Sequence, residues 1–260
     1  MAPETEFPRW NDRWALFLDV DGTLLDIAHH PEAVRPTPRL KLLLRRALIA
    51  LDGSVALVSG RSIIGLDRLF APLVLPAAGL HGVERRSADG TVHYSASMDD
   101  RLHAAKRRLM DFAEKHPGVL LEDKGAALAL HYRNAPDLAD RSARLMSEVA
   151  LAAGRDFHVQ QGKMVLELKP AGHDKGTAVR CFMQEPPFLD RIPVFIGDDV
   201  TDEDGFAAVN DMGGLSIRVG DGCATRAAWK IGSVEEFLAW LEDSLLDGEP
   251  EQGEVTNVES

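Results

Sequence analysis

The sequence predicts an α/β protein with a Rossmann-like parallel-sheet core and an inserted α+β cap domain. Short apolar segments that end in polar or glycine-rich turns alternate with amphipathic helices, an order typical of βαβ units and parallel sheets. A central block with a different pattern interrupts this order and indicates an insertion. We therefore expect the core at residues 1–98 and 171–246, the cap at 99–170 and a disordered acidic tail at 247–260.

The first apolar segment, WALFLDVDGTLL, is the most informative. Its residues Trp14–Leu18 are predicted to form a buried strand, because the run is too short for a typical helix. Asp19 and Asp21 follow where the strand stops, and Gly22 then breaks the pattern. Ligands of open α/β sheets bind at such strand ends, and carboxylates two residues apart on an extended chain point the same way. A solvated turn or a calcium-type loop are the alternatives, although an EF-hand loop needs further acidic positions.

The other elements of the core follow from similar patterns. Leucines and alanines on one face predict a helix over residues 38–51. Further strands are predicted at residues 55–58, at 74–75 leading through Pro76 into the turn GLHG at 79–82, and at 192–196. Helices are expected near residues 175–183 and over 234–246.

The central block has its own order of elements, which we interpret as αββαβ. Amphipathic helices are predicted over residues 98–115 and 138–153, the second ending at Gly154. Two hairpin-like alternating segments lie at residues 120–132 and 158–168.

Composition limits the classes of function. The chain has 260 residues with 45% hydrophobic and 27% charged residues, which is ordinary for a soluble globular protein. Its net charge of −12 argues against nucleic acid and anionic membranes as partners, but a local cluster of cations could still bind an anionic small molecule. No apolar run is long enough to span a membrane, and the polar N-terminus is unlike a secretory signal, so we expect a cytoplasmic protein. The two cysteines, Cys181 and Cys223, are predicted to be buried or partly buried thiols.

Acidic residues also follow the strand predicted at residues 192–196. Asp198 and Asp202 lie in the segment GDDVTDED directly after it. If this strand and the first strand are neighbours, these acids meet Asp19 and Asp21 in an oxygen-rich site suited to Mg²⁺. An acidic helix N-terminus is the alternative, and it explains Glu203 better than it explains Asp198.

Two further groups of polar residues suit an anion. Ser59, Gly60 and Arg61 follow a predicted strand, where a hydroxyl and exposed amides can hold a phosphate, although a plain helix cap would look the same. Lys175 begins a predicted helix, where the helix dipole disfavours a cation unless it faces an anion.

The order of these motifs resembles a known family. DVDGT, then SGR, then Lys175, then GDDVTDED resembles the four-motif pattern of the haloacid dehalogenase superfamily. The longer segments DGTLLDIAHHPEAV, VSGRS, GLHGVE, EDKGAALALHYR, ELKP and GDDVTDEDGF resemble the trehalose-6-phosphate phosphatase family within it. The resemblance extends from about residue 15 to about residue 205 and leaves out both tails.

The resemblance implies a Mg²⁺-dependent hydrolase of trehalose 6-phosphate in trehalose biosynthesis, with an aspartyl-phosphate intermediate. It implies that Asp19 is the nucleophile and Asp21 the general acid and base. It assigns the metal to the Asp19 carboxylate, the Asp21 backbone carbonyl and Asp198, with Asp202 behind them. Ser59 and Lys175 would neutralise the phosphate, beside Gly60 and Arg61.

Three charged residues of the central block are implied to bind the sugar. Glu122 and Lys124 are two residues apart in one predicted strand, and Glu167 lies between apolar positions in another. The pattern alone favours a solvated sheet face. The resemblance instead implies that the three hold the distal glucose hydroxyls, where charged groups discriminate well between sugars. Further candidates for lining the cleft are Arg133, His81 and Gly82.

Two other functions remain open from the sequence. One is a capped phosphatase for another sugar phosphate, such as sucrose phosphate or mannosyl-3-phosphoglycerate. The other is a sugar-phosphate sensor without catalysis, for which loss of the nucleophile would be the expected sign, whereas Asp19 and Asp21 are present. The oligomeric state cannot be predicted.

Overall fold

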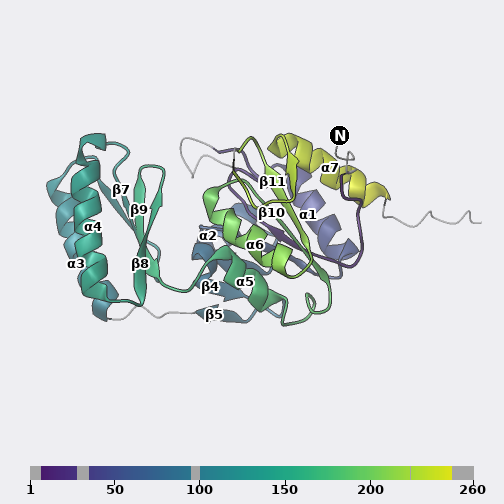
Figure 1. Ribbon diagram of the computed structural model, residues 1–260, viewed down its shortest axis with the longest axis horizontal. Helices are drawn as coiled ribbons and strands as arrows, with labels where there is room; N and C mark the ends of the chain where they lie inside the picture. The colour runs from purple at the N-terminus through teal and green to yellow at the C-terminus, as the bar shows by residue number, and fades with distance from the viewer. Residues whose placement is uncertain (1–6, 28–34, 95–99, 223, 248–260) are drawn as a thin grey trace, which may run out of the picture. The chain divides into compact units, whose positions relative to one another are not determined.

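A computed structural model describes residues 7–27, 35–94, 100–222 and 224–247 (Figure 1). Contacts within the chain divide it into two compact units, Met1–Val55 with Met183–Ser260, and Ala56–Phe182. The second unit holds the whole central block, together with elements predicted for the core. The domain boundaries expected from the sequence, 1–98 with 171–246 and 99–170, stay a prediction.

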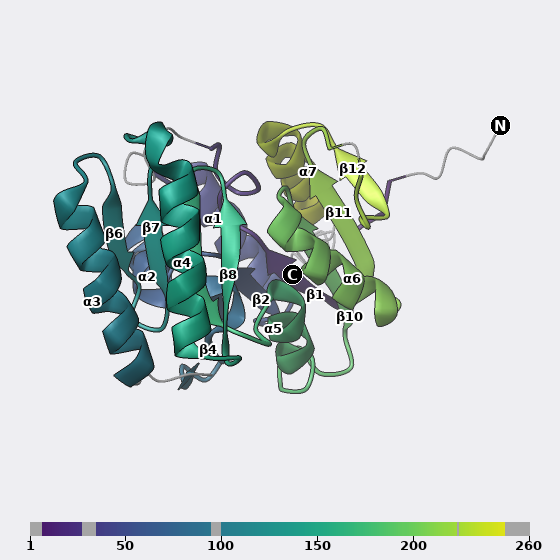
Figure 2. The same cartoon turned by 60° about the vertical axis from the view of Figure 1, so that its left-hand side comes forward.

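The first unit contains a parallel sheet in the order β12-β11-β10-β1. Its strands are β1 (Trp14–Leu18), β10 (Ile192–Gly197), β11 (Leu215–Val219) and β12 (Trp229–Ile231), and its helices are α1 (Pro38–Ala50), the short 3₁₀ turn η4 (Val200–Asp202), α6 (Glu203–Asp211) and α7 (Val234–Asp247). Helix α6 covers β10 and β11, and α1 contacts α7 (Figure 2). Every residue of β1 is buried, as the apolar segment predicts.

Local chemistry explains where the helices of this unit begin. Thr37 caps α1, because its hydroxyl accepts from the backbone N–H of Leu40, and Pro38 occupies the first turn, where no backbone donor is needed. Leu40, Leu43 and Leu44 on one face of the helix are buried, which confirms the amphipathic pattern.

The second unit begins within β2 (Val55–Val58) and includes strands of both directions. They are followed by α2 (Ile63–Phe70), β3 (Ala77–Gly79), the 3₁₀ turn η2 (Leu80–Gly82), β4 (Glu84–Arg86) and β5 (Val92–Tyr94). Strands β2 and β3 are parallel, while β3, β4 and β5 are antiparallel. The strand predicted at residues 74–75 in fact begins at Ala77, because Val74 is exposed and the chain pairs with β2 only from the Pro76 carbonyl onward.

The central block folds as a four-stranded antiparallel sheet in the order β6-β7-β9-β8. Its elements are α3 (Asp100–Lys115), β6 (Leu120–Asp123), β7 (Leu128–His131), the turn η3 (Pro136–Leu138), α4 (Ala139–Ala153), β8 (Phe157–Gly162) and β9 (Val165–Pro170), followed by α5 (Lys175–Phe182). The order is therefore αββαββ, because the segment at 158–168 holds two strands joined by a turn rather than one. Helices α3 and α4 pack side by side against this sheet (Figure 1).

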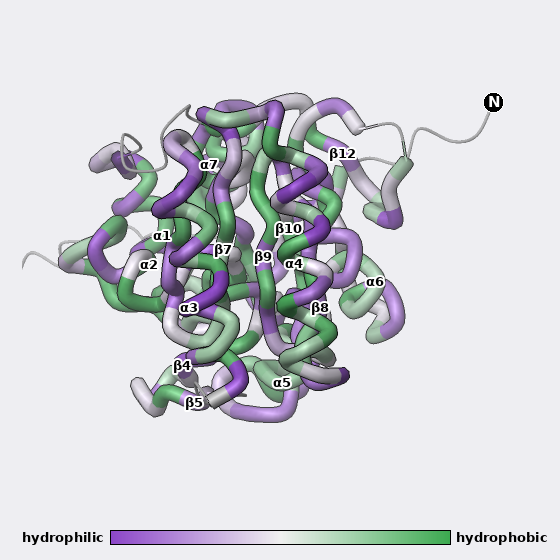
Figure 3. Tube along the Cα trace, turned by 90° about the vertical axis from the view of Figure 1, so that its left-hand side faces the viewer, coloured by the Kyte–Doolittle hydropathy of each residue, from purple (hydrophilic) through white to green (hydrophobic). Residues whose placement is uncertain are grey.

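Hydrophobic and hydrophilic residues alternate along β9 (Figure 3), so the sheet has two different faces. Leu130, Leu166 and Leu168 point into a core that they share with residues of α3 and α4, such as Leu109 and Met146. Glu167 and Lys169 alternate with those leucines, so they lie on the opposite face.

The structure can also be compared with the predictions for the cysteines, for the C-terminal tail and for membrane-spanning segments. Cys181 is exposed, so the prediction of a buried thiol is wrong there, because its side chain lies on the outer side of α5. Cys223 and the predicted disordered tail lie outside the described residues, except for Asp247 at the end of α7. No helix among the described residues is long and apolar enough to cross a membrane.

Candidate active site

The first unit gathers three carboxylates at the carboxyl ends of two adjacent parallel strands. Asp19 follows β1 and Asp198 follows β10, and these strands pair directly. Oxygen atoms of Asp19, Asp198 and Asp202 lie within 4.8 Å of one another. Because like charges this close repel, the cluster favours a cation between them. An all-oxygen donor set suits a hard ion such as Mg²⁺.

The backbone around this cluster leaves room only for glycine at two positions. Gly22 has φ of +96°, and a Cβ there would lie 2.1 Å from Oδ2 of Asp198. A Cβ on Gly197 would lie 2.3 Å from Cγ of Asp202. Both glycines therefore let a carboxylate approach the backbone closely. The Asp19 backbone N–H donates to the carbonyl of Ile196, which ties the end of β1 to β10 at 2.9 Å.

Asp202 holds the backbone at Asp198 and Asp199 in place. It is completely buried, and its Oδ2 accepts from the backbone N–H groups of Asp198 at 3.0 Å and Asp199 at 2.9 Å. Thr23 donates its hydroxyl to Oδ1 of Asp198 at 3.3 Å. Asp21 is half-buried, and its side chain is not part of the three-carboxylate cluster. Its expected part in the metal site, through the backbone carbonyl, stays a prediction.

In the second unit, the SGR segment is held by the turn η2. Ser59 is buried, and its hydroxyl accepts from the backbone N–H of Arg61 at 3.2 Å. The backbone N–H of His81 donates to the Ser59 carbonyl at 2.9 Å, and that of Leu80 donates to the Arg61 carbonyl at 3.0 Å. Leu80 and His81 both have positive φ, a strained conformation for residues other than glycine that often marks functional sites. A Cβ on Gly60 would lie 2.7 Å from Nε2 of His81, so the imidazole rests directly on this glycine.

Turn η2 also contacts the start of α5. A Cβ on Gly82 would lie 2.7 Å from the carbonyl oxygen of Asp174, so Gly82 serves this close approach. Asp174 caps the helix, because its Oδ1 accepts from the backbone N–H of Thr177 at 2.6 Å. Lys175 then begins the helix, as predicted, and it is only 2% exposed. Lysines are rarely this buried unless they are paired with a polar or anionic group.

The four-stranded sheet of the central block, β6-β7-β9-β8, is called the cap sheet below, and its polar face brings two predicted sugar ligands together. Lys124 Nζ lies 3.1 Å from Oε1 of Glu167. Glu167 is only 7% exposed, so the solvated face favoured by the pattern alone is wrong here. Glu122 lies on the same face, because both glutamates stand directly opposite Ala129 in the register. Arg133, by contrast, is exposed beyond the end of β7.

The imidazole of His81 connects the SGR segment to this face. Its Nε2 lies 3.8 Å from Oε2 of Glu167, and its Nδ1 is buried without a hydrogen-bond partner in the described part of the chain. Burial lowers the pKa of His81 well below its usual range, and the charges of Lys175, Lys169 and Lys124 lower this pKa further. The ring is therefore neutral at pH 7, and its contact with Glu167 is not an ion pair.

Two residues of this face were missed by the sequence-based prediction. Lys169 is only 4% exposed and stands opposite His158. His131 contacts Glu122, with 2.9 Å between Nε2 and Oε2. The signal was present as spacing, because Lys169 is two residues after Glu167 and His131 is two after Ala129.

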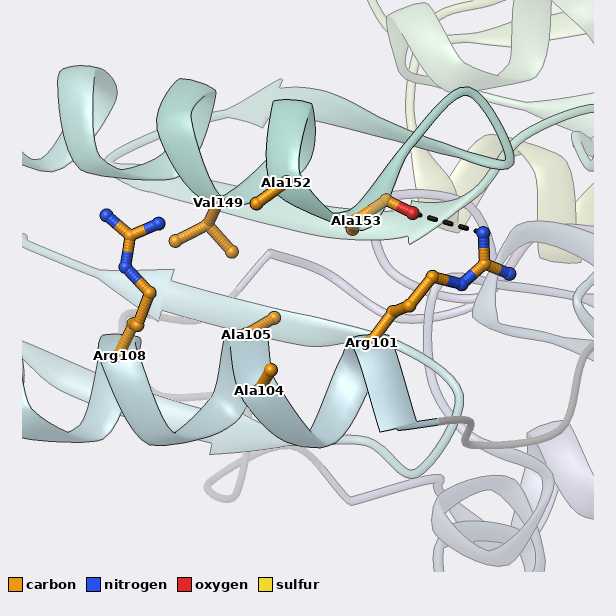
Figure 4. A pocket seen from close by; sticks show the side chains of 7 residues that line it. All are labelled: Arg101, Ala104, Ala105, Arg108, Val149, Ala152 and Ala153. Atoms are coloured by element: carbon orange, nitrogen blue, oxygen red, sulfur yellow. Dashed lines mark hydrogen bonds between the residues drawn. The ribbon is translucent and has the colours of Figure 1, made fainter.

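A separate groove of about 240 Å³ lies between α3 and α4 (Figure 4). Its lining consists of Arg101, Ala104, Ala105, Arg108, Val149, Ala152 and Ala153. Arg101 stands at one end and donates to the carbonyl of Ala153 at 3.2 Å. The groove contains none of the predicted site residues, and we assign it no part in catalysis.

Comparisons with known proteins show to which family the chain belongs. The family model of trehalose-phosphatase matches residues 17–230. The chain belongs to the trehalose-phosphatase family. It is 43% identical over 247 residues to the trehalose-6-phosphate phosphatase of Escherichia coli strain K12, with 92% of this chain and 90% of the relative covered. It is 50% identical over 209 residues to a probable trehalose-phosphate phosphatase of Sinorhizobium fredii, with 80% of this chain and 78% of the relative covered.

A solved structure supports the same conclusion. The crystal structure of a trehalose-6-phosphate phosphatase related protein matches with a TM-score of 0.75 and 29% sequence identity, covering 90% of this chain and 97% of that one. These findings confirm the predicted family, the α/β fold class, and the predicted class of enzyme, a phosphoric monoester hydrolase.

Proposed function

We propose that this enzyme hydrolyses trehalose 6-phosphate to trehalose and phosphate, with Mg²⁺ and an aspartyl-phosphate intermediate. The observation that carries the mechanism is the cluster of Asp19, Asp198 and Asp202 at the ends of β1 and β10. The similarity to the trehalose-6-phosphate phosphatase of Escherichia coli supports the choice of substrate.

In the proposed reaction Asp19 and Asp21 divide the chemistry. A carboxylate oxygen of Asp19 attacks phosphorus in line, and the bond from phosphorus to the sugar oxygen breaks as Asp21 gives that oxygen its proton. Asp21 then accepts a proton from the water that attacks phosphorus. The bond between phosphorus and the Asp19 oxygen breaks, so inorganic phosphate is released and the Asp19 carboxylate is restored. Phosphoryl transfer of this kind depends mainly on positioning and on neutralising charge.

The donor set fits Mg²⁺, because the three carboxylates converge and no soft ligand belongs to the cluster. Asp19 and Asp198 would hold the ion through carboxylate oxygens and Asp21 through its backbone carbonyl. Asp202 would act behind them, since its Oδ2 already accepts two backbone N–H groups. A bound Mg²⁺ neutralises charge on the phosphate oxygens.

Residues of the second unit are proposed to bind the rest of the substrate. Ser59 and Lys175 would neutralise the phosphate, with the backbone of Gly60 and the side chain of Arg61 beside them. Burial of both Ser59 and Lys175 supports this assignment, since each has a polar group away from bulk water.

The sugar is proposed to bind on the polar face of the cap sheet, through Glu122, Lys124 and Glu167. A sugar that lacks a matching hydroxyl would leave these charged groups unpaired, which provides discrimination. His81 would line the cleft as a neutral imidazole. The exposure of Arg133 and the packing of Gly82 on α5 make these two candidates weaker.

Phosphate release from a panel of sugar phosphates tests this function, with Mg²⁺ and with chelator. The panel consists of trehalose 6-phosphate, sucrose 6-phosphate, glucose 6-phosphate and mannosyl-3-phosphoglycerate. Mg²⁺-dependent preference for trehalose 6-phosphate is the expected result. Preference for another member would retain the chemistry and refute the sugar assignment, and no release from any of them would favour a sensor. The cytoplasmic location expected from the sequence stays a prediction.

A further inference from the structure

The polar face of the cap sheet carries its charged groups in a defined pattern. One row of residues crosses the four strands on this face, because each residue stands directly opposite the next. The row consists of Glu122 in β6, Ala129 in β7, Glu167 in β9 and Gln160 in β8. Ala129 separates the two glutamates and has no side chain beyond Cβ. The two carboxylates of the row are thus on different strands, and each needs its own neighbour to fix its orientation.

Lys124 provides that neighbour for Glu167, with 3.1 Å between Nζ and Oε1. His131 provides it for Glu122. In the antiparallel pair of β6 and β7, His131 stands opposite Leu120, which places it diagonally across from Glu122 on the same face. Its Nε2 lies 2.9 Å from Oε2 of Glu122, a normal hydrogen-bond distance.

The chemistry of the pair fixes the direction of this hydrogen bond. The hydrogen bond from His131 lowers the pKa of Glu122, more than burial raises it, and the charge of Lys124 lowers it further. Glu122 is therefore an anion at pH 7. An ionised carboxylate only accepts hydrogen bonds, so Nε2 of His131 carries the proton and donates it.

The contact leaves one oxygen of Glu122 available. Oε2 accepts from His131, while Oε1 has no hydrogen-bond partner in the part of the chain that the structure describes. A long, half-exposed glutamate side chain otherwise samples several rotamers, and ordering it on binding costs entropy. A single hydrogen bond from the neighbouring strand restricts the carboxylate before the sugar arrives, which is preorganisation.

We propose that His131 is a positioning residue of the sugar subsite, which holds Oε2 of Glu122 so that Oε1 accepts from a substrate hydroxyl. This inference rests on the proposed function, because it deepens the assignment of Glu122 to sugar binding. The side chains of His131 and Glu122 are 37% and 48% exposed. Exposed pairs of this kind contribute little to folding stability, so the contact acts on binding rather than on the fold.

The test compares His131→Ala with His131→Gln, which keeps an N–H donor on a side chain of similar length. For trehalose 6-phosphate, His131→Ala is expected to raise KM about five-fold with little change in kcat, as for loss of one exposed hydrogen bond to a charged group. His131→Gln is expected to recover most of that loss. His93→Ala, at an exposed position of β5, is the matched control and should leave both constants unchanged.

A double-mutant cycle with Glu122→Gln shows whether His131 acts through Glu122. If it does, adding His131→Ala to Glu122→Gln raises KM little further, and the pKa of Glu122, followed by carboxyl NMR, rises in the His131→Ala protein. Fully additive losses, or an unchanged KM in His131→Ala, would overturn the inference while leaving the proposed function intact. A wild-type enzyme that does not turn over trehalose 6-phosphate would overturn both.

Discussion

Replacing Gly22 with alanine tests the geometry of the carboxylate cluster most directly. Gly22 follows Asp21 with φ of +96°, a conformation that side-chain-bearing residues rarely adopt. An alanine Cβ would lie 2.1 Å from Oδ2, 2.3 Å from Cγ and 2.5 Å from Oδ1 of Asp198. The methyl group would therefore occupy the position of the carboxylate that we assign to the metal.

The structure gives the size of both effects. A residue other than glycine in the left-handed region costs about 1–2 kcal/mol in folding stability. Ordinary van der Waals contact begins at 3.4 Å, so Oδ2 of Asp198 has to move by about 1.3 Å, the difference between 3.4 and 2.1 Å. A displacement of about 1 Å at a reacting centre can cost about 100-fold in rate. We expect Gly22→Ala to lose about 100-fold in kcat/KM, beyond a modest loss of stability.

Gly213→Ala is the matched control, because Gly213 also has positive φ, +71°, but no atom lies within 4 Å of its added Cβ. The assay measures phosphate release against Mg²⁺ concentration, together with denaturant unfolding of both variants. Gly213→Ala should lose similar stability and keep its activity. Equal activity of the two variants, at equal stability, would refute the argument that Gly22 makes room for Asp198.

Other predictions follow from single groups of the site. Asp19→Asn should abolish turnover of trehalose 6-phosphate and of small phosphate esters alike, measured as phosphate release, and residual turnover of either would contradict its part as nucleophile. Glu167→Ala should damage turnover of trehalose 6-phosphate far more than that of a small ester, so equal losses would remove the sugar-binding assignment. Chelation of Mg²⁺ should stop phosphate release and lower the unfolding temperature, because an ion bound only to the folded state stabilises it. The lowered pKa of His81 predicts that folding stability falls as pH drops below about 6.5, because the unfolded chain takes up the proton first. The free energy of unfolding, measured with denaturant between pH 7.5 and 5, should depend less on pH in His81→Gln than in the wild type. An equal or steeper pH dependence in the variant would contradict a buried neutral ring.

The parts of the fold that the sequence predicted well are those whose burial is decided locally. Strand β1 has the predicted bounds, because five consecutive apolar residues must be buried on both faces. Helix α1 begins at the predicted residue, because Thr37 and Pro38 together define a helix start. Asp19 and Asp198 could likewise be placed at strand ends, since each directly follows such a run.

The errors arise where the local signal is weak or contradicts the tertiary structure. Strand β3 consists of two alanines and a glycine, which have low strand propensity. The strand was therefore predicted too early, at the more apolar Val74, which is exposed. Strands β8 and β9 were predicted as one segment, because the turn between them, Lys163 and Met164, lacks the usual turn residues. Met164 has φ of +65°, which this tight connection imposes on a residue that rarely adopts it.

The contacts of the cap face could not be derived from spacing alone. Spacing puts Glu122 and Lys124 on one face of a strand, but it does not say which strand lies beside them. The register of the sheet identifies the neighbours. Strand β7 separates β6 from β9, and Ala129 lies between the two glutamates. Pairing of Lys124 with Glu167, rather than with Glu122, is therefore a property of the sheet order and not of the local sequence.

The net charge of the whole chain says little about the field that a substrate meets. The chain carries a net charge of −12, yet burial and the positive charges of Lys175, Lys169 and Lys124 lower the pKa of His81. The first unit, in contrast, concentrates negative charge in its three-carboxylate cluster. Each unit thus has a local field of its own, which the net charge of the chain does not reveal. The lysines of the second unit suit the oxygens of a phosphate monoester, and the carboxylates of the first unit suit a divalent cation.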